Sequence, residues 1–257
     1  WQQALRTRLR NGFFNKDRDF IRRWPKTPKI LFFGAPNAFL DEYQHRFAID
    51  LGIPIVSMGS LYEQVKMETG SSEEFNHPFF HKVKAALDEG DIDFLAREKI
   101  PLKLLRLSAF TQEGFLLNDF PNTVAEAEML EEFRGGMNAF VHLSLPDEVL
   151  IDLEENKFQC ENCGKVYFQE PVEHEELGVR ISEFIPKHGH CYDCGSNQFR
   201  FGGDNIHFEQ QLKQYKASKE ELLSFYDTYG LLVDFEPKNG MEDYEKFRKK
   251  VQGYIKH

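Results

Sequence analysis

The chain has 257 residues, of which 41% are hydrophobic, and a formal net charge of -10 at neutral pH. This length and composition fit an ordinary globular protein with one sizeable core, either one domain with appendages or two small domains. No run of about 18 apolar residues occurs, which excludes a membrane-spanning helix. Because the chain begins with Trp1 and not with Met, we expect a processed chain that a targeting segment once preceded.

Positive and negative charges are concentrated in different parts of the chain. Residues 1–29 hold nine Lys or Arg and two acids, so this segment carries +7 and leaves -17 for the remainder. Aromatic and aliphatic residues alternate with those cations, namely Trp1, Phe13, Phe14, Phe20, Ile21 and Trp24. A basic, aromatic arm on an acidic body favours a segment that docks on a partner or derives from an Arg-rich presequence, and a solvated surface helix is the alternative.

Short apolar runs alternate with helical patterns along the rest of the chain. We expect strands at 30–33, 54–57, 115–117, 140–145 and 231–235. We expect helical stretches that follow the turn Gly34-Ala35-Pro36 and end at 48, and further helices at 61–68, 82–88, 99–109, 209–216, 219–229 and from 241 onward. This alternation predicts an α/β fold, a parallel sheet with helices on both faces.

All four cysteines occur in two Cys-x-x-Cys pairs, Cys160/Cys163 and Cys191/Cys194, each followed by glycine. Such knuckles point two thiolates at one ion, and two of them predict a structural Zn²⁺ site that stabilises a lobe and has no open position for catalysis. Two redox pairs or a disulfide framework are the competing interpretations. His188 and His190 are spare ligands that four thiolates make unnecessary. The stretch 170–189 between the pairs has no long apolar period, so we expect an inserted, separately stabilised lobe.

Six segments in collinear order resemble the adenylate kinase family, in particular the members with a zinc-bound lid. They are 29–36, 52–59, 114–127, 160–167, 211–215 and 222–226. The resemblance runs from about Lys29 to the C-terminus. It implies a P-loop kinase-like core at 29–152 and 212–257, with an AMP-lobe-like insertion at about 57–95, a zinc-ribbon lid at 153–211 and an N-terminal extension at 1–28.

The phosphate loop departs from the family pattern. The family's Gly-x-Pro-Gly-x-Gly-Lys-Gly-Thr cradles phosphate with backbone N–H groups and a lysine. Here the nine positions are Gly34, Ala35, Pro36, Asn37, Ala38, Phe39, Leu40, Asp41 and Glu42. Leu40 replaces the lysine, Phe39 replaces a glycine, and Asp41 and Glu42 place carboxylates where the resemblance implies an anion.

Other positions that the resemblance assigns to phosphate or metal also change. An arginine of the AMP lobe becomes Glu63, the metal-linked aspartate becomes Asn118, and a glycine after it becomes Asp119. The remaining replacements are Asn122, Glu126, Leu153 and Gln211, and cations survive at Lys157 and, within an alignment ambiguity of one residue near Asp204, at Arg200. Phosphoryl transfer depends on positioning and positive charge, so these losses predict that the chain is not an enzyme, with no catalytic residues and no nucleotide cofactor.

The sequence therefore predicts an adenylate-kinase-like structural subunit of a large assembly. A mitochondrial complex on the matrix side, respiratory-chain or ribosomal, is the favoured setting, and a ciliary or cytoskeletal assembly is the alternative. We expect protein partners to bind the arm, and nucleic acid to bind only in a ribosomal setting. The competing functions are a nucleoside monophosphate kinase with a divergent phosphate site, a nucleotide sensor and an RNA-binding protein.

Overall fold

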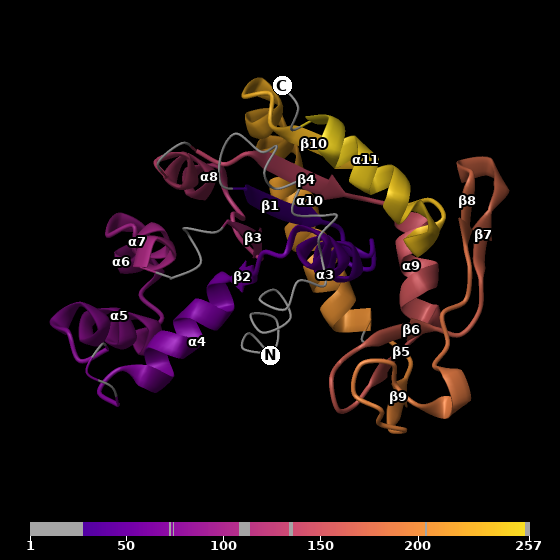
Figure 1. Ribbon diagram of the computed structural model, residues 1–257, viewed down its shortest axis with the longest axis horizontal. Coiled ribbons are helices and arrows are strands. Elements are labelled where there is room, and N and C mark those ends of the chain that lie inside the picture. Colours follow the sequence, from indigo (N-terminus) through magenta and orange to yellow (C-terminus); the bar gives the residue numbers. More distant parts are fainter. Residues whose placement is uncertain are drawn as a thin grey trace.

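A five-stranded parallel sheet forms the centre of the molecule (Figure 1). The computed structural model describes residues 28–71, 73, 75–107, 114–133, 136–203 and 205–254. The strand order is β10–β4–β1–β3–β2, and all paired strands are parallel. The strands are β1 Lys29–Gly34, β2 Ile55–Ser57, β3 Phe115–Asn118, β4 Ala139–Leu143 and β10 Leu232–Phe235. Their carboxyl ends meet at one edge, which is where ligands bind in open α/β sheets.

The sheet is covered on both faces because its side chains alternate between two layers of helices. Ile30 and Phe32 pack into one apolar cluster and Leu31 into the other. The first cluster draws on α3 Leu40–Leu51, α9 Asp147–Asn156 and α11 Tyr244–Tyr254. The second draws on α7 Ile100–Leu107, α8 Val124–Glu131 and α10 Asn205–Thr228. The predicted α/β fold with a parallel sheet is therefore confirmed.

Phenylalanine supplies much of this core. The rings of Phe47, Phe115, Phe140 and Phe247 are fully buried. Tyr43 and Phe247 meet edge to face, with ring centroids 5.0 Å apart, a geometry that aromatic pairs prefer. In the described part of the chain, the excess of Phe therefore serves core packing to a large extent.

A helical lobe lies beside β2 (Figure 1). It consists of α4 Met58–Glu68, α5 Pro78–Glu89, α6 Ile92–Arg97 and α7. Val65, Val83, Ile100 and Leu104 are buried at its centre and form a cluster separate from the two that cover the sheet.

Antiparallel strands form the segment that contains the cysteines. Strands β5 Lys157–Cys160, β6 Val166–Phe168 and β9 Phe199–Phe201 form a three-stranded sheet, which we call the ribbon, and β7 Val172–His174 pairs with β8 Val179–Ile181 in a hairpin. Three 3₁₀ turns complete the described structure: η2 Glu175–Leu177, η3 Lys187–Gly189 and η4 Gly240–Asp243.

The structure corrects three expectations. The segments 209–216 and 219–229 belong to one helix, α10, because neither Gly nor Pro interrupts residues 205–228. Helix α6, which Asp91 caps, was not foreseen from the sequence. The stretch 170–189 is not a separately stabilised lobe, because apolar residues on one face of its short hairpin pack into the main core. No described helix is both long and apolar enough to cross a membrane.

Candidate functional site

The loop between β1 and α3 has a left-handed backbone at two residues that are not glycine. The φ angle is 62° at Asn37 and 60° at Phe39. At Gly34, a Cβ atom would lie 2.7 Å from the carbonyl oxygen of Leu143, so only glycine fits against β4 there. Left-handed residues within such turns are a feature of backbone nests that bind anions. The loop therefore adopts a left-handed backbone at two positions, Asn37 and Phe39, where the resemblance implies glycine.

Side-chain contacts stabilise this conformation, which costs a residue with a Cβ atom about 1–2 kcal/mol. The Asn37 amide donates to Glu154 Oε2 at 2.8 Å and to the Leu150 carbonyl oxygen at 3.3 Å. Phe39 is 7% exposed, and its ring lies 5.6 Å from that of Phe168 in the ribbon. The residues that replace glycine thus connect the loop to α9 and to the ribbon.

A cleft of about 920 Å³ opens in front of the loop at the carboxyl edge of the sheet. Its walls come from the loops that follow β1 and β3, from strands β5 and β6, and from α10. This volume lies in the range of ordinary small-molecule sites. The loops after β1 and β3 are brought together because the two strands are neighbours in the sheet.

The cleft is predominantly acidic. Carboxylates of Asp41, Glu42, Asp119 and Glu221 line it. Lys157 is the only Lys or Arg among the described lining residues, and its ammonium group pairs at 2.5 Å with Glu154, a side chain that is almost fully buried. Burial raises the pKa of the Glu42 carboxyl, and the charge of Asp41 raises it further. A bound polyphosphate would therefore need neutralisation by Mg²⁺ or another external cation.

Asp119 occupies the N-terminus of α4. Its carboxylate accepts hydrogen bonds from the N–H of Met58 at 2.9 Å, the N–H of Gly59 at 3.3 Å and the Ser57 hydroxyl at 3.1 Å. Asp119 adopts a φ of 60° in doing so. The donors at a helix N-terminus attract anions, and here a carboxylate of the protein itself satisfies them.

A buried histidine supports the wall of the cleft. His142 Nδ1 lies 2.7 Å from Asp234 Oδ1, and its Nε2 lies 2.8 Å from the hydroxyl of Tyr215, which lines the cleft. Because a carboxylate only accepts, Nδ1–H donates to Asp234 and Nε2 accepts from the Tyr215 hydroxyl. The hydrogen bond from His142 holds the pKa of the Asp234 carboxyl below its usual value.

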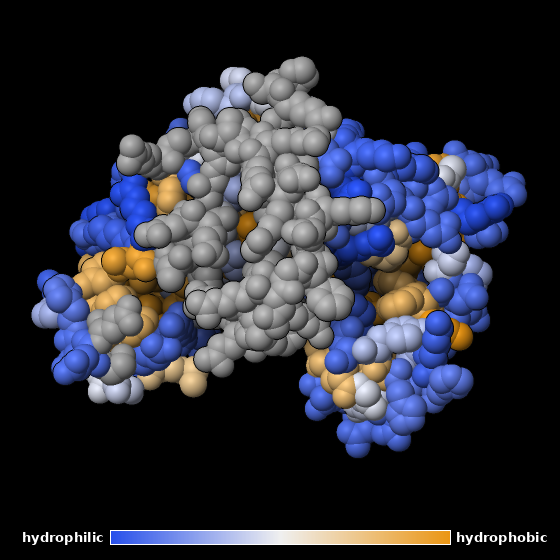
Figure 2. Space-filling model, in the orientation of Figure 1, coloured by the Kyte–Doolittle hydropathy of each residue, from blue (hydrophilic) through white to orange (hydrophobic). Residues whose placement is uncertain are grey.

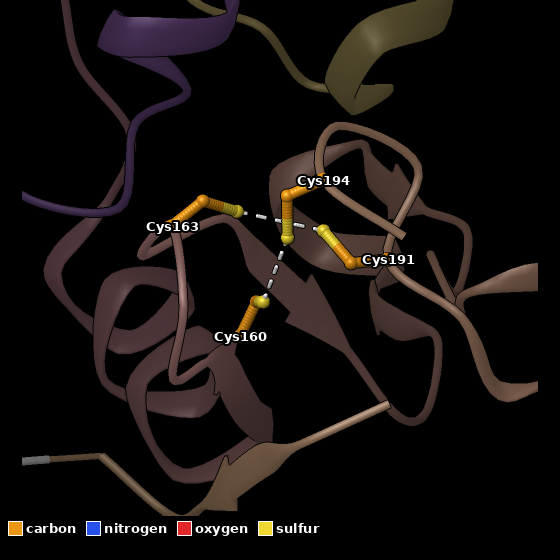
Figure 3. Close-up of side chains that lie close together, drawn as sticks. All are labelled: Cys160, Cys163, Cys191 and Cys194. Carbon is orange, nitrogen blue, oxygen red and sulfur yellow. Dashed lines mark hydrogen bonds between the residues drawn. The ribbon is translucent and has the colours of Figure 1, made fainter. Parts of the chain in front are cut away.

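The four cysteines converge at the tip of the ribbon (Figure 3). The Sγ atoms of Cys160 and Cys194 are 3.5 Å apart, as are those of Cys163 and Cys191, and all four lie within 4.8 Å of one another. Four thiolates at about 2.3 Å from a tetrahedral ion would be separated by about 3.8 Å. The arrangement fits such an ion, so these cysteines are able to hold a metal.

Matching turns orient the two pairs. The N–H of Gly164 donates to the Cys160 carbonyl at 2.8 Å, and that of Gly195 donates to the Cys191 carbonyl at 2.9 Å. Both glycines are left-handed, with φ of 74° and 73°. The Tyr167 hydroxyl donates to Cys191 Sγ at 3.2 Å, an interaction that would orient a thiolate ligand.

Known proteins match most of the chain. It is 25% identical over 218 residues to "Adenylate kinase 1, chloroplastic" of Arabidopsis thaliana, which covers 83% of this chain and 73% of that protein. It is 28% identical to an adenylate kinase of Thermodesulfovibrio yellowstonii, over 79% of this chain and 89% of that protein. The chain is an adenylate kinase homologue. An adenylate kinase of a Geobacillus species is 27% identical to the chain, and the match covers 84% of this chain and 93% of the bacterial protein.

No protein-family model matches this chain. Its relatives are nonetheless adenylate kinases over about four fifths of the chain, so the protein is nucleoside-monophosphate-kinase-like. These relatives contradict the prediction that the chain is not an enzyme, because they point to a kinase. That prediction treated the missing cations as proof of inactivity. The charges of a cleft set how strongly it stabilises phosphate, and therefore the rate, but their loss does not show that the rate is zero.

The structure brings together most of the residues that the sequence singled out. Phe39, Leu40, Asp41, Asn118 and Lys157 all line the cleft, and the four cysteines cluster. Asp204 and residues 1–27 lie outside the described residues.

Sequence reasoning missed two parts of the site. For Glu154 the sequence offered one signal of a buried role: this carboxylate lies next to Leu153 on the apolar face of α9. The role of Asp119 as a cap had none, because its partners Ser57 and Met58 are some 60 residues away in the chain.

We predict that Asp234→Asn lowers the free energy of unfolding at neutral pH and that its effect shrinks as the pH falls below about 4. The pKa of Asp234 is lower in the folded state, so its contribution is present above the unfolded pKa and is lost as the pH falls through the folded pKa. Urea unfolding at several pH values measures this effect. In a His142→Gln background the same substitution should lose most of its pH dependence, and an unchanged dependence would contradict the assignment.

Proposed function

We propose that the chain is a nucleoside monophosphate kinase with a divergent phosphate site, which works as an accessory subunit of a large mitochondrial assembly. The observation that carries the kinase assignment is the loop at 34–40, which has a left-handed backbone at Asn37 and Phe39 and lines the cleft at the carboxyl edge of the sheet. Homology to adenylate kinases along both the core and the ribbon supports it.

The composition of the cleft predicts slow turnover for the proposed kinase. The loop has no lysine, the Lys157 ammonium group is paired with Glu154, and the N–H groups of Ala35 and Ala38 already donate to carbonyl oxygens of the chain. We therefore assign the positioning of phosphate to the other backbone N–H groups of the loop and of the first turn of α3. Removing one preorganised group of this kind typically costs roughly a hundred- to a thousandfold in rate, and several such losses are not additive. Turnover therefore depends on Mg²⁺ and on the remaining polar groups.

We predict that the chain forms ADP slowly from AMP and Mg-ATP and that Leu40→Lys increases turnover at least tenfold. The new ammonium group would enter the cleft from the first turn of α3, where the resemblance places the family's lysine. A coupled ADP-formation assay at micromolar enzyme measures both rates.

Lys157→Ala is expected to reduce turnover at least tenfold, and the matched control Lys249→Ala, at an exposed position of α11, should leave it unchanged. The kinase assignment would be contradicted if the wild-type chain formed no more ADP than Lys157→Ala and if Leu40→Lys added none.

We propose further that the four cysteines bind Zn²⁺ as a structural ion. Four thiolates, two of them buried, are the donor set that tetrahedral zinc prefers. The ribbon has only a small core of its own, formed by Phe158, Tyr167 and Phe199 around Cys160 and Cys191. Since this core is small, the ion would supply much of the folding free energy of the ribbon.

We predict one zinc ion per chain and selective loss of the ribbon fold when the ion is removed. A strong chelator or Cys191→Ser should abolish protection from hydrogen exchange in β5, β6 and β9 and leave β1 and β4 protected. His188→Ala, at an exposed residue between the cysteine pairs, is the control. Retained ribbon protection in metal-free protein would show that zinc has no structural role.

The proposed assembly role rests on the charge of the arm. Residues 1–28 are basic and aromatic, and the remainder of the chain is acidic. Such a segment suits an anionic partner surface, either a protein subunit or ribosomal RNA. A respiratory-chain complex and a mitochondrial ribosome both offer surfaces of this kind.

We predict that the full chain co-sediments with a large complex when mitochondria are lysed gently and that a chain without residues 1–27 does not. Truncation removes eight of the 32 Lys and Arg residues, all of them from the basic arm, but none of the residues that form the described core. Sucrose-gradient sedimentation with immunodetection separates the two outcomes. Full-length protein found only at the monomer position, or outside mitochondria, would overturn this part of the proposal.

A further inference from the structure

The β7–β8 hairpin, which lies within the predicted lid, packs on the core. Figure 1 shows the two strands beside α9 and near the end of α11, and contacts join β7 to α9. Val172, Val179 and Ile181 are between 2% and 5% exposed, and they belong to the same apolar cluster as Ile30 and Phe32 of the central sheet. The hairpin therefore shares the core of the sheet and not the small core of the ribbon.

One contact joins the hairpin, the phosphate loop and the C-terminal region. A Cβ atom at Gly240 would lie 3.3 Å from Ile181 Cγ2 and 3.3 Å from Phe39 Cζ, so both side chains pack against this glycine. Phe39 also meets Phe168 at the end of β6. A side chain that replaces a loop glycine thus packs against both the base of the ribbon and the surface on which the hairpin sits.

Polar contacts hold the edges of the hairpin. The N–H of Arg180 donates to the Lys238 carbonyl at 2.8 Å, and the Lys238 ammonium group donates to the Leu177 carbonyl at 3.2 Å. On the other strand, His174 Nε2 lies 2.7 Å from Asp152 Oδ2 of α9. The hairpin is therefore attached to the core on both strands, before and after its 3₁₀ turn η2.

We infer that the β7–β8 hairpin is a clasp that holds the ribbon in a fixed position over the cleft. In enzymes with moving lids, closure over the substrate completes the site, and opening often limits turnover. Here buried contacts between protein side chains join the lid to the core, and packed interfaces of this kind shift between discrete states and do not deform continuously. The clasp is a property of the fold whether or not phosphoryl transfer occurs.

The strand β8 supplies its own matched control. Val179 and Ile181 face the core, and the Arg180 side chain between them is 73% exposed and pairs with Glu173 of the same hairpin. Arg180→Ala removes side-chain atoms from the outer face, whereas Ile181→Ala removes them from the clasp. The Arg180 amide, which donates to the core, reports attachment directly.

The experiment is hydrogen exchange with mass spectrometry on the full, zinc-loaded chain. We expect exchange of peptide 172–182 in the wild-type chain to be at least a hundredfold slower than in an unstructured peptide. Ile181→Ala should accelerate it at least tenfold, and Arg180→Ala should change it less than threefold. Exchange in β4 and the zinc content should remain those of the wild type, which distinguishes detachment from unfolding.

Fast exchange of the hairpin in the wild-type chain would overturn the inference, as would equal effects of the two substitutions. If Ile181→Ala unfolds the whole chain, the milder Ile181→Val decides: it should accelerate exchange in peptide 172–182 more than in β4, and uniform acceleration would also overturn the clasp. None of these results depends on kinase activity, so failure of the clasp and failure of the proposed function are separately recognisable.

Discussion

The left-handed backbone of Asn37 and Phe39 sets the shape of the loop that lines the cleft. A phosphate loop is normally built from glycines because they adopt this conformation at no steric cost. Here the conformation is maintained by the hydrogen bond from Asn37 to Glu154 and by the burial of the Phe39 ring. The shape of the loop is thus a product of tertiary contacts. The function that we propose depends on those contacts, because it relies on the backbone of this loop to position phosphate.

The same contacts link the loop to the parts that surround it. Glu154 joins the loop through Asn37 and the base of the ribbon through Lys157. Phe39 contacts the ribbon through Phe168 and packs on Gly240 beside Ile181 of the hairpin. The side chain of Phe39 thus makes this region a packed, partly apolar junction, so the slow turnover and the fixed ribbon that we propose have a common origin.

Local signals were sufficient for the fold and for the metal centre. The apolar run at Ile30, the turn at Gly34 and the two Cys-x-x-Cys knuckles each depend on residues close in sequence, and the parallel sheet and the cysteine cluster followed from them. The predicted break at Ala217 and Ser218 was wrong because neither residue interrupts a helix: alanine has the highest helix propensity and serine only a moderately lower one. The hairpin was misjudged because two strands of three residues show too short a period to reveal the buried face.

Long-range pairs could not be foreseen. Asp119 caps α4 across some 60 residues, and His142 joins Asp234 and Tyr215 from three separate elements. The order of the strands in the sheet decides which residues become hydrogen-bond partners. The type of a single residue does not indicate its partner. The prediction of inactivity is contradicted by the relatives, which are adenylate kinases, because it counted only the charges that were lost at single positions.

The central claim is that the loop backbone still positions phosphate. A crystal structure of the chain with Mg²⁺ and a non-hydrolysable ATP analogue tests it most directly. We expect ordered phosphates against the backbone N–H groups of residues 37–42, with the metal between them and the carboxylates of the cleft. A cleft that remains empty at millimolar nucleotide, or a nucleotide bound elsewhere on the molecule, would contradict this account.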